Sequence, residues 1–338
     1  MEQVNDIGEF KLIERITKLL PQTASVVVGP GDDAAIYKLS SGQIVAVTCD
    51  MLIEGIHFDL NACLAGDVGW RAMTASLSDI AAMGCKPLLA TISIGMPQNT
   101  PVATVEQIYD GLARAAREHA VAIVGGDTVK SPERIVIDVS MIGEPVSSKY
   151  LTRSGASDGN AIVVTGYPGQ SAAGLEIALS CTKFARLYEK ELLKAHLEPC
   201  ARVEQGLLLA QNTGVTAAID LSDGLVQDLG RICEMSHLGA VVDVKKLPVS
   251  PHLAEYSRTK GENAMKFCLS GAEDYELVFT VHPDSLDQVL ADWQNKFDVL
   301  ATAIGYMTNE LSTVHLENAD EITLNDTAGY DHFRPAPH

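Results

Sequence analysis

Five short segments of this sequence carry aspartates beside small or polar residues, and they are spread from one end of the chain to the other. They read Gly31-Asp32-Asp33-Ala34-Ala35, Thr48-Cys49-Asp50, Leu77-Ser78-Asp79, Gly125-Gly126-Asp127-Thr128 and Asp220-Leu221-Ser222-Asp223-Gly224. Most adjoin an apolar run, so we expect each carboxylate to lie in a turn at the rim of a buried strand or helix. One such aspartate alone commonly caps a helix or closes a turn. Together, the five segments predict an oxygen-rich site for hard cations, and the groups that such cations most often bind are phosphates.

Motifs of other phosphate and metal sites are missing. The dipeptide Gly-Lys does not occur, which excludes a Walker A loop, and protein-kinase signatures are absent. An EF-hand starting at Asp220 would need oxygen ligands where Gly224 and Arg231 stand. An Asp-x-Asp phosphatase would need a carboxylate in place of Ser222. The Asp220 segment therefore remains a strand-to-helix turn, with Ser222 and Asp223 at the helix N-terminus.

Two further signals are weak by themselves. The Gly125-Gly126 pair would let the backbone approach a phosphate while Asp127 holds the attached cation, although a tight turn explains the same residues. His57 lies among apolar residues, where a structural role is the commoner one.

Bulk properties narrow the class of protein. The 338 residues suffice for two domains, and no apolar run is long enough to cross a membrane. The N-terminus lacks a signal peptide, and the seven cysteines, without a Cys-x-x-Cys pair, predict reduced thiols. A net charge of −19 argues against binding to nucleic acid or to an anionic membrane. We therefore expect a cytoplasmic protein.

Hydrophobic periodicity predicts an α/β fold. Helices are expected around residues 12–20, 68–83, 105–119, 171–179 and 225–235, and strands over 25–28, 43–48, 88–94, 121–124, 135–142, 162–165, 217–219, 241–244, 277–281 and 300–304. The segment 143–159 is rich in Ser, Gly and Pro and predicts the boundary between two domains, 1–147 and 148–338. Residues 334–338 are expected to be disordered.

Taken together, the motifs resemble the thiamine-monophosphate kinase family of the aminoimidazole-ribotide-synthetase-like superfamily, over nearly the whole chain. The resemblance rests on the aspartate segments and on Gly8-Glu9-Phe10, His57-Phe58, Leu77–Gly84, Leu151–Gly155, Pro168–Gly174, Ile219–Gly224, Ser270–Leu277 and Gly329–Phe333. The Glu273–Leu277 and Gly329–Phe333 pieces point to this family within the superfamily. Aminoimidazole ribotide synthetase and a non-enzymatic nucleotide-binding protein remain the alternatives.

The resemblance implies ATP-dependent phosphorylation of thiamine phosphate to thiamine diphosphate, by two α/β domains that dimerise through the N-terminal sheet. It assigns magnesium binding to Asp33, Thr48, Cys49, Asp50, Asp79, Asp127, Asp220 and Asp223. It assigns ATP binding to Gly126, Asp127, Arg153 and Ser222, and thiamine phosphate binding to His57, Glu273 and Tyr330. The acceptor is a phosphate oxygen already ionised at neutral pH, so we expect no acid or base residue and a direct in-line transfer.

One residue departs from the family pattern, which usually has threonine where Cys49 stands. A backbone carbonyl would bind magnesium equally well from either residue. A thiol suits magnesium poorly, so ligation through the side chain would lose one hard ligand.

Overall fold

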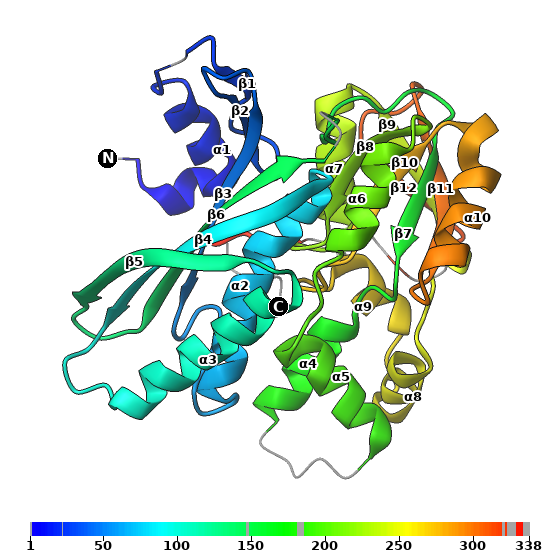
Figure 1. Ribbon diagram of the computed structural model, residues 1–338. Coiled ribbons are helices and arrows are strands. Elements are labelled where there is room, and N and C mark those ends of the chain that lie inside the picture. The colour runs from blue at the N-terminus through cyan, green and yellow to red at the C-terminus, as the bar shows by residue number, and fades with distance from the viewer. Residues whose placement is uncertain are drawn as a thin grey trace.

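The computed structural model describes residues 2–21, 23–146, 149–180, 186–319, 322 and 329–333. Two mixed six-stranded sheets with helices packed on them form an N-terminal half, up to residue 146, and a C-terminal half, from residue 149 on (Figure 1). The expected boundary at 147/148 and the expected disorder of 334–338 lie outside the described residues.

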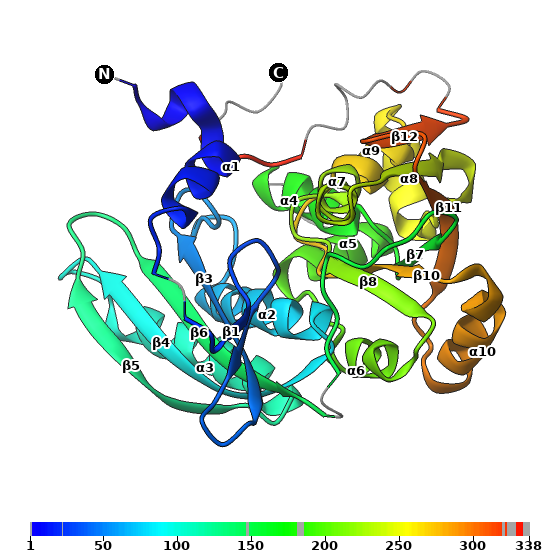
Figure 2. The same cartoon turned by 90° about the horizontal axis from the view of Figure 1, so that it is seen from above.

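The N-terminal half has the sheet order β1-β2-β3-β6-β4-β5. Its elements are α1 (Val4–Thr17), β1 (Val26–Val28), β2 (Ala35–Lys38), β3 (Ile44–Ile53), α2 (Ala65–Ala82), β4 (Cys85–Met96), α3 (Val102–Glu118), β5 (Ala122–Lys130) and β6 (Val136–Pro145). Helices α2 and α3 lie on one side of the sheet, and its other side faces outward (Figure 2). On β3, Ala46, Thr48 and Leu52 are accordingly buried, while Val47, Cys49 and Met51 are exposed.

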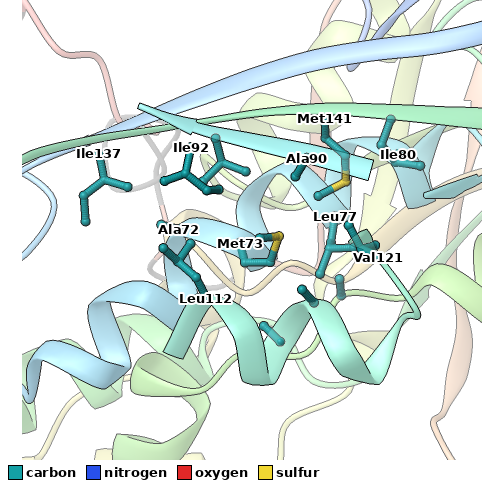
Figure 3. Close-up of a cluster of buried hydrophobic side chains, with 14 of the residues drawn as sticks. Ala72, Met73, Leu77, Ile80, Ala90, Ile92, Leu112, Val121, Ile137 and Met141 are labelled. Atoms are coloured by element: carbon teal, nitrogen blue, oxygen red, sulfur yellow. The ribbon is translucent and has the colours of Figure 1, made fainter. Parts of the chain in front are cut away.

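Helix α2 is buried along most of its length, because small residues let its neighbours come close. A Cβ at Gly69 would lie 1.9 Å from the carbonyl oxygen of Ile108 on α3, and one at Gly111 of α3 would lie 1.9 Å from the carbonyl oxygen of Gly66. Met73 and Leu77 fill the space between the sheet and α3 (Figure 3). This packing fixes the position of α2, on which the site described below depends.

The C-terminal half has the sheet order β12-β9-β11-β7-β10-β8. Its elements are β7 (Ala161–Thr165), α4 (Gln170–Leu179), α5 (Leu187–Leu197), α6 (Val203–Gln211), β8 (Val215–Asp220), α7 (Leu225–Ser236), β9 (Gly239–Asp243), α8 (Pro251–Lys260), α9 (Ala264–Ser270), β10 (Leu277–Val281), α10 (Leu286–Lys296), β11 (Ala301–Thr308) and β12 (Val314–Glu317), with short 3₁₀ turns at Val244–Lys246 and Pro283–Ser285. Helices α4, α5, α7, α8 and α9 cover one face, and α6 and α10 cover the other together with the end of α2.

Every helix and strand expected from periodicity is present, and Asp79 lies in the last turn of α2, as the predicted helix 68–83 requires. The expectation of a turn is wrong for two aspartates: strand β3 continues to Ile53, so Asp50 lies within it, and Asp127 lies inside β5. Backbone pairing across the sheet extends these strands beyond the local apolar runs. None of the described helices combines the length and apolarity needed to cross a bilayer.

Candidate metal and substrate site

Three of the predicted aspartates meet where the two halves of the protein join. Asp33 comes from the turn before β2, Asp79 from the end of α2 and Asp220 from the end of β8. One carboxylate oxygen of each lies within 4.8 Å of those of the other two. We call these three residues the aspartate cluster. Its members come from both halves, so the cluster exists only in the assembled fold.

Hydroxyl groups orient these carboxylates. Ser78 Oγ donates to Asp220 Oδ2 at 2.6 Å, and Thr48 Oγ1 donates to the Asp79 carboxylate and to the backbone oxygen of Asp33. Asp50 Oδ2 lies beside the cluster and accepts from Ser76 Oγ at 3.0 Å. Sequence reasoning placed Ser78 in one of the five aspartate segments without giving it a role, and it missed Ser76.

The cluster is too acidic to be fully ionised by itself. The pKa of the Asp220 carboxyl is raised to about 8, mainly by burial and to a smaller extent by the charge of Asp33. Burial, and next the charge of Asp50, raise the pKa of the Asp79 carboxyl well above its ordinary value. Asp33 Oδ2 is buried and has no hydrogen-bond partner among the described residues. Several hard oxygen atoms and an unused acceptor fit a divalent cation such as Mg²⁺, which would restore the ionised state.

Arg153 brings positive charge to the cluster from the segment between the two sheets. Its Nη2 lies 2.6 Å from Asp33 Oδ1, and its Nε donates to the same oxygen at 3.2 Å. Its backbone N–H donates to the Asp32 carboxylate at 3.2 Å. The predicted phosphate-binding arginine therefore lies at the cluster, although its guanidinium is engaged by Asp33.

A second group consists of the three predicted substrate contacts and two residues beside them. We call this group the recognition cluster; its members are His57, Arg71, Glu273, Tyr330 and His332. Arg71 Nη2 on α2 donates to both carboxylate oxygens of Glu273 at 2.6 Å and to the His57 carbonyl at 2.9 Å. The ring of His332 lies 5.0 Å from that of His57 and 4.9 Å from that of Tyr330, between ring centres. The three predicted substrate residues are thus brought together by two that sequence reasoning missed.

The backbone around Glu273 is strained. Glu273 and Tyr275 have φ angles of 60° and 52°, a left-handed conformation that non-glycine residues rarely adopt. Their N–H groups donate to the carbonyls of Ser222 and Leu221, at 2.9 Å each. Such conformations persist where the surrounding structure imposes them, and they concentrate at functional sites.

Comparisons with known proteins identify the family of this chain. Residues 31–144 match the family described as AIR synthase related protein, N-terminal domain, and residues 157–316 match the corresponding C-terminal domain. Thiamine-monophosphate kinase of Escherichia coli strain K12 is 36% identical over 332 residues, which cover 96% of this chain and 98% of that protein. The chain belongs to the thiamine-monophosphate kinase family.

Solved structures of this family share the fold. A structure described as AaThiL complexed with AMPPCP and TMP is 32% identical, with a TM-score of 0.86, and the match covers 98% of this chain and 99% of that one. The Escherichia coli hydrogenase maturation protein HypE has a TM-score of 0.68 at 19% identity, with 98% of both chains covered, which shows a shared fold alone.

The remaining residues that the family pattern assigns to magnesium and ATP lie at different distances from the cluster. Asp50 on β3 is paired with Val139 on β6, which is paired with Ile92 on β4, which in turn is paired with Gly126 on β5. Asp50 and Gly126 are therefore three strand spacings apart, which is about 14 Å. Asp127 pairs with exposed Ser93, so its side chain lies on the outward face of the sheet, opposite to that of Asp50. A Cβ at Gly126 would lie 1.8 Å from the Ile92 carbonyl oxygen, so strand pairing itself requires this glycine. The described chain therefore does not bring Gly126 and Asp127 into the aspartate cluster.

Cys49 also points away from the cluster. It alternates on β3 with Thr48 and Asp50, and its side chain is exposed on the outward face. Ligation of a cluster cation by the thiol is therefore excluded, and only the backbone carbonyl of Cys49 remains available to the site.

The loop after Asp220 differs from the predicted helix cap. Gly224, not Ser222 or Asp223, is the N-cap of α7. The buried carboxylate of Asp228 takes the cap's role, because its Oδ2 accepts from the N–H groups of Asp223 and Gly224 at 3.1 and 3.0 Å. The Asp223 carboxylate accepts from Gln227 Nε2, which also donates to the Tyr330 carbonyl at 2.8 Å. This loop thereby connects the aspartate cluster to the recognition cluster.

Proposed function

We propose that this chain transfers the γ-phosphoryl group of ATP to the phosphate of thiamine phosphate and so forms thiamine diphosphate. The observation that carries the proposal is the convergence of three carboxylates, those of Asp33 and Asp220 buried and that of Asp79 half-buried, with a recognition cluster that shares helix α2. Membership in the thiamine-monophosphate kinase family supports it, as does the similar structure described as bound to AMPPCP and TMP.

Magnesium fits the donor set of the aspartate cluster. Asp33, Asp79 and Asp220 would hold it, with Asp50, Thr48 and Asp223 beside them and the Cys49 carbonyl as a further oxygen. When bound, magnesium neutralises the negative charge of the two phosphates and of the transferred group. The aspartate carboxylates would hold the cation in position. The hydroxyls of Thr48 and Ser78 hold the carboxylates of Asp79 and Asp220 in place.

The two substrates would contact different sets of residues. ATP would contact Arg153 and Ser222, and Arg153 would release Asp33 to bind a phosphate oxygen. Gly126 and Asp127, on the edge strand β5, lie outside this arrangement. Thiamine phosphate would place its organic part against His57, Glu273 and Tyr330. No residue needs to accept a proton from the ionised acceptor oxygen, so positioning and charge neutralisation suffice for direct in-line transfer.

We also propose that the active form is a homodimer that pairs through the outward face of the N-terminal sheet. Val47 and Met51 on β3, and Val124 and Val129 on β5, are 39–58% exposed there. Apolar side chains gathered on an uncovered sheet face are typical of an interface. The cytoplasmic location expected from the sequence stays a prediction.

A coupled assay for thiamine diphosphate formation tests the proposal. Purified protein should convert thiamine phosphate with ATP and magnesium, and activity should disappear with a chelator. Aminoimidazole ribotide synthetase activity would instead require the matching formylglycinamidine substrate, and a non-enzymatic nucleotide-binding protein would turn over neither. Absence of thiamine diphosphate with fully folded protein would overturn the proposal.

A further inference from the structure

The contacts of Arg71 are not explained by metal binding. Arg71 lies on α2 of the N-terminal half, and its side chain is 2% exposed. Its Nη2 bridges the Glu273 carboxylate, which belongs to the C-terminal half, and the His57 carbonyl of the loop after β3. A buried arginine thus joins the two segments that hold the predicted substrate contacts.

Glu273 is the member of this ion pair that a ligand can reach. Its side chain is 24% exposed, and its segment is held in a left-handed backbone conformation. Burial is the largest influence and would raise the pKa of the Glu273 carboxyl, but the charge and the hydrogen bond of Arg71, together with the nearby His196 and His57, outweigh it and lower the pKa, so the carboxylate stays ionised. Arg71 therefore determines both the charge and the orientation of the exposed carboxylate.

The neighbouring histidine cannot replace Arg71. His196 Nδ1 lies 3.7 Å from Glu273 Oε2, but burial, and next the charge of Arg71, lower the pKa of His196 to about 4. His196 is therefore neutral at physiological pH, and its Nδ1 is shared with Ser171 Oγ at 3.1 Å. Among the described contacts of Glu273, Arg71 supplies the full positive charge.

Helix α2 connects this ion pair to the aspartate cluster. Arg71 and Ser78 are two turns apart and lie on the same face of the helix, and Ser78 holds Asp220. Asp79 follows Arg71 by eight residues, a rise of about 12 Å along the axis. One rigid, buried helix thereby sets the separation between the organic end and the phosphate end of a bound substrate.

We propose that Arg71 is a positioning residue that determines recognition of the organic part of thiamine phosphate, by holding Glu273 and the His57 loop in register with the aspartate cluster. This inference rests on the proposed function. It predicts that loss of Arg71 impairs thiamine phosphate binding and leaves ATP binding intact, because Arg153 and the cluster keep their own contacts.

The test compares Arg71→Lys and Arg71→Met with the wild type. Lysine keeps the charge on a shorter side chain, and methionine removes it. We expect the thiamine phosphate KM to rise roughly 100-fold in Arg71→Met and about tenfold in Arg71→Lys, with the ATP KM unchanged. Calorimetric titration with thiamine phosphate should show the same order of affinities without turnover.

Arg202→Met is the matched control. Arg202 also pairs with a glutamate of the same segment, Glu276, through Nε at 2.7 Å, and its side chain is largely buried. The Arg202→Met substitution should lower the melting temperature without a selective rise in the thiamine phosphate KM. If Arg71→Met does not fold, Arg71→Lys, which keeps a positive charge beside Glu273, carries the test: its thiamine phosphate KM should still rise about tenfold with the ATP KM unchanged.

Two results separate the possible failures. Wild-type protein that forms no thiamine diphosphate would overturn the proposed function itself. An active wild type, with folded Arg71 variants whose thiamine phosphate KM is unchanged or whose ATP KM rises equally, would overturn the role of Arg71 alone.

Discussion

Replacing Asp220 by asparagine should make the metal-free protein more stable at alkaline pH. The Asp220 carboxyl is 2% exposed, and its pKa is raised from 3.8 to about 8 by burial and by the charge of Asp33. The folded protein therefore holds a proton that the unfolded chain has already lost. This contribution to stability is fully present below about pH 4, where both states are protonated, and is lost progressively as the pH rises from there through about 8.

The size of the effect follows from the two pKa values. Proton linkage at this one carboxyl removes about 1.4 kcal/mol of folding stability between about pH 7 and about pH 9. With the usual unfolding entropy per residue, that corresponds to a fall of about 2 °C in the melting temperature. The side-chain amide introduced by Asp220→Asn does not titrate and can still accept the hydrogen bond of Ser78, so the variant lacks this contribution.

Thermal unfolding in the presence of a chelator measures the difference directly. The melting temperature of the wild type should fall more steeply with pH than that of Asp220→Asn, and histidine titration cancels in the comparison. Adding magnesium should restore the wild type most strongly at high pH, because the cation binds the ionised carboxylate. Parallel melting curves for the two proteins without metal, or magnesium stabilisation that is equal in both, would refute the reasoning.

Four further outcomes are expected. Asp50→Asn should lower kcat about 100-fold or more, whereas Asp127→Asn, on the opposite face of the sheet, should leave it near normal; steady-state kinetics showing near-normal turnover of Asp50→Asn would remove that residue from the site. His57→Ala and Glu273→Gln should raise the KM for thiamine phosphate more than that for ATP, and the reverse pattern would exchange the two substrate assignments. Chiral γ-thiophosphate of ATP should give inverted product, whereas retention would reveal a phosphoenzyme. Sedimentation should give a dimer at micromolar concentration, and a monomer would contradict pairing through the N-terminal sheet.

Local sequence determined the secondary structure and the chemistry of the site. Strand β10 occupies the predicted range Leu277–Val281, because a short apolar run between polar residues specifies a buried strand without reference to the rest of the fold. The aspartates at positions 33, 79 and 220 were identifiable because acidic residues beside small ones are unusual next to apolar runs. Their side-chain chemistry alone predicted a hard cation and phosphate, and the family resemblance specified magnesium.

Tertiary structure decided which of these residues meet. Asp50 and Asp127 look equivalent in the sequence, yet strand register places them on opposite faces of one sheet, and register depends on partners far away in the chain. Arg71 gave no signal in the sequence, because its partner Glu273 lies 202 residues later and reaches it only when the two halves pack together. Long-range pairing of this kind is set by packing between elements, which no local pattern records.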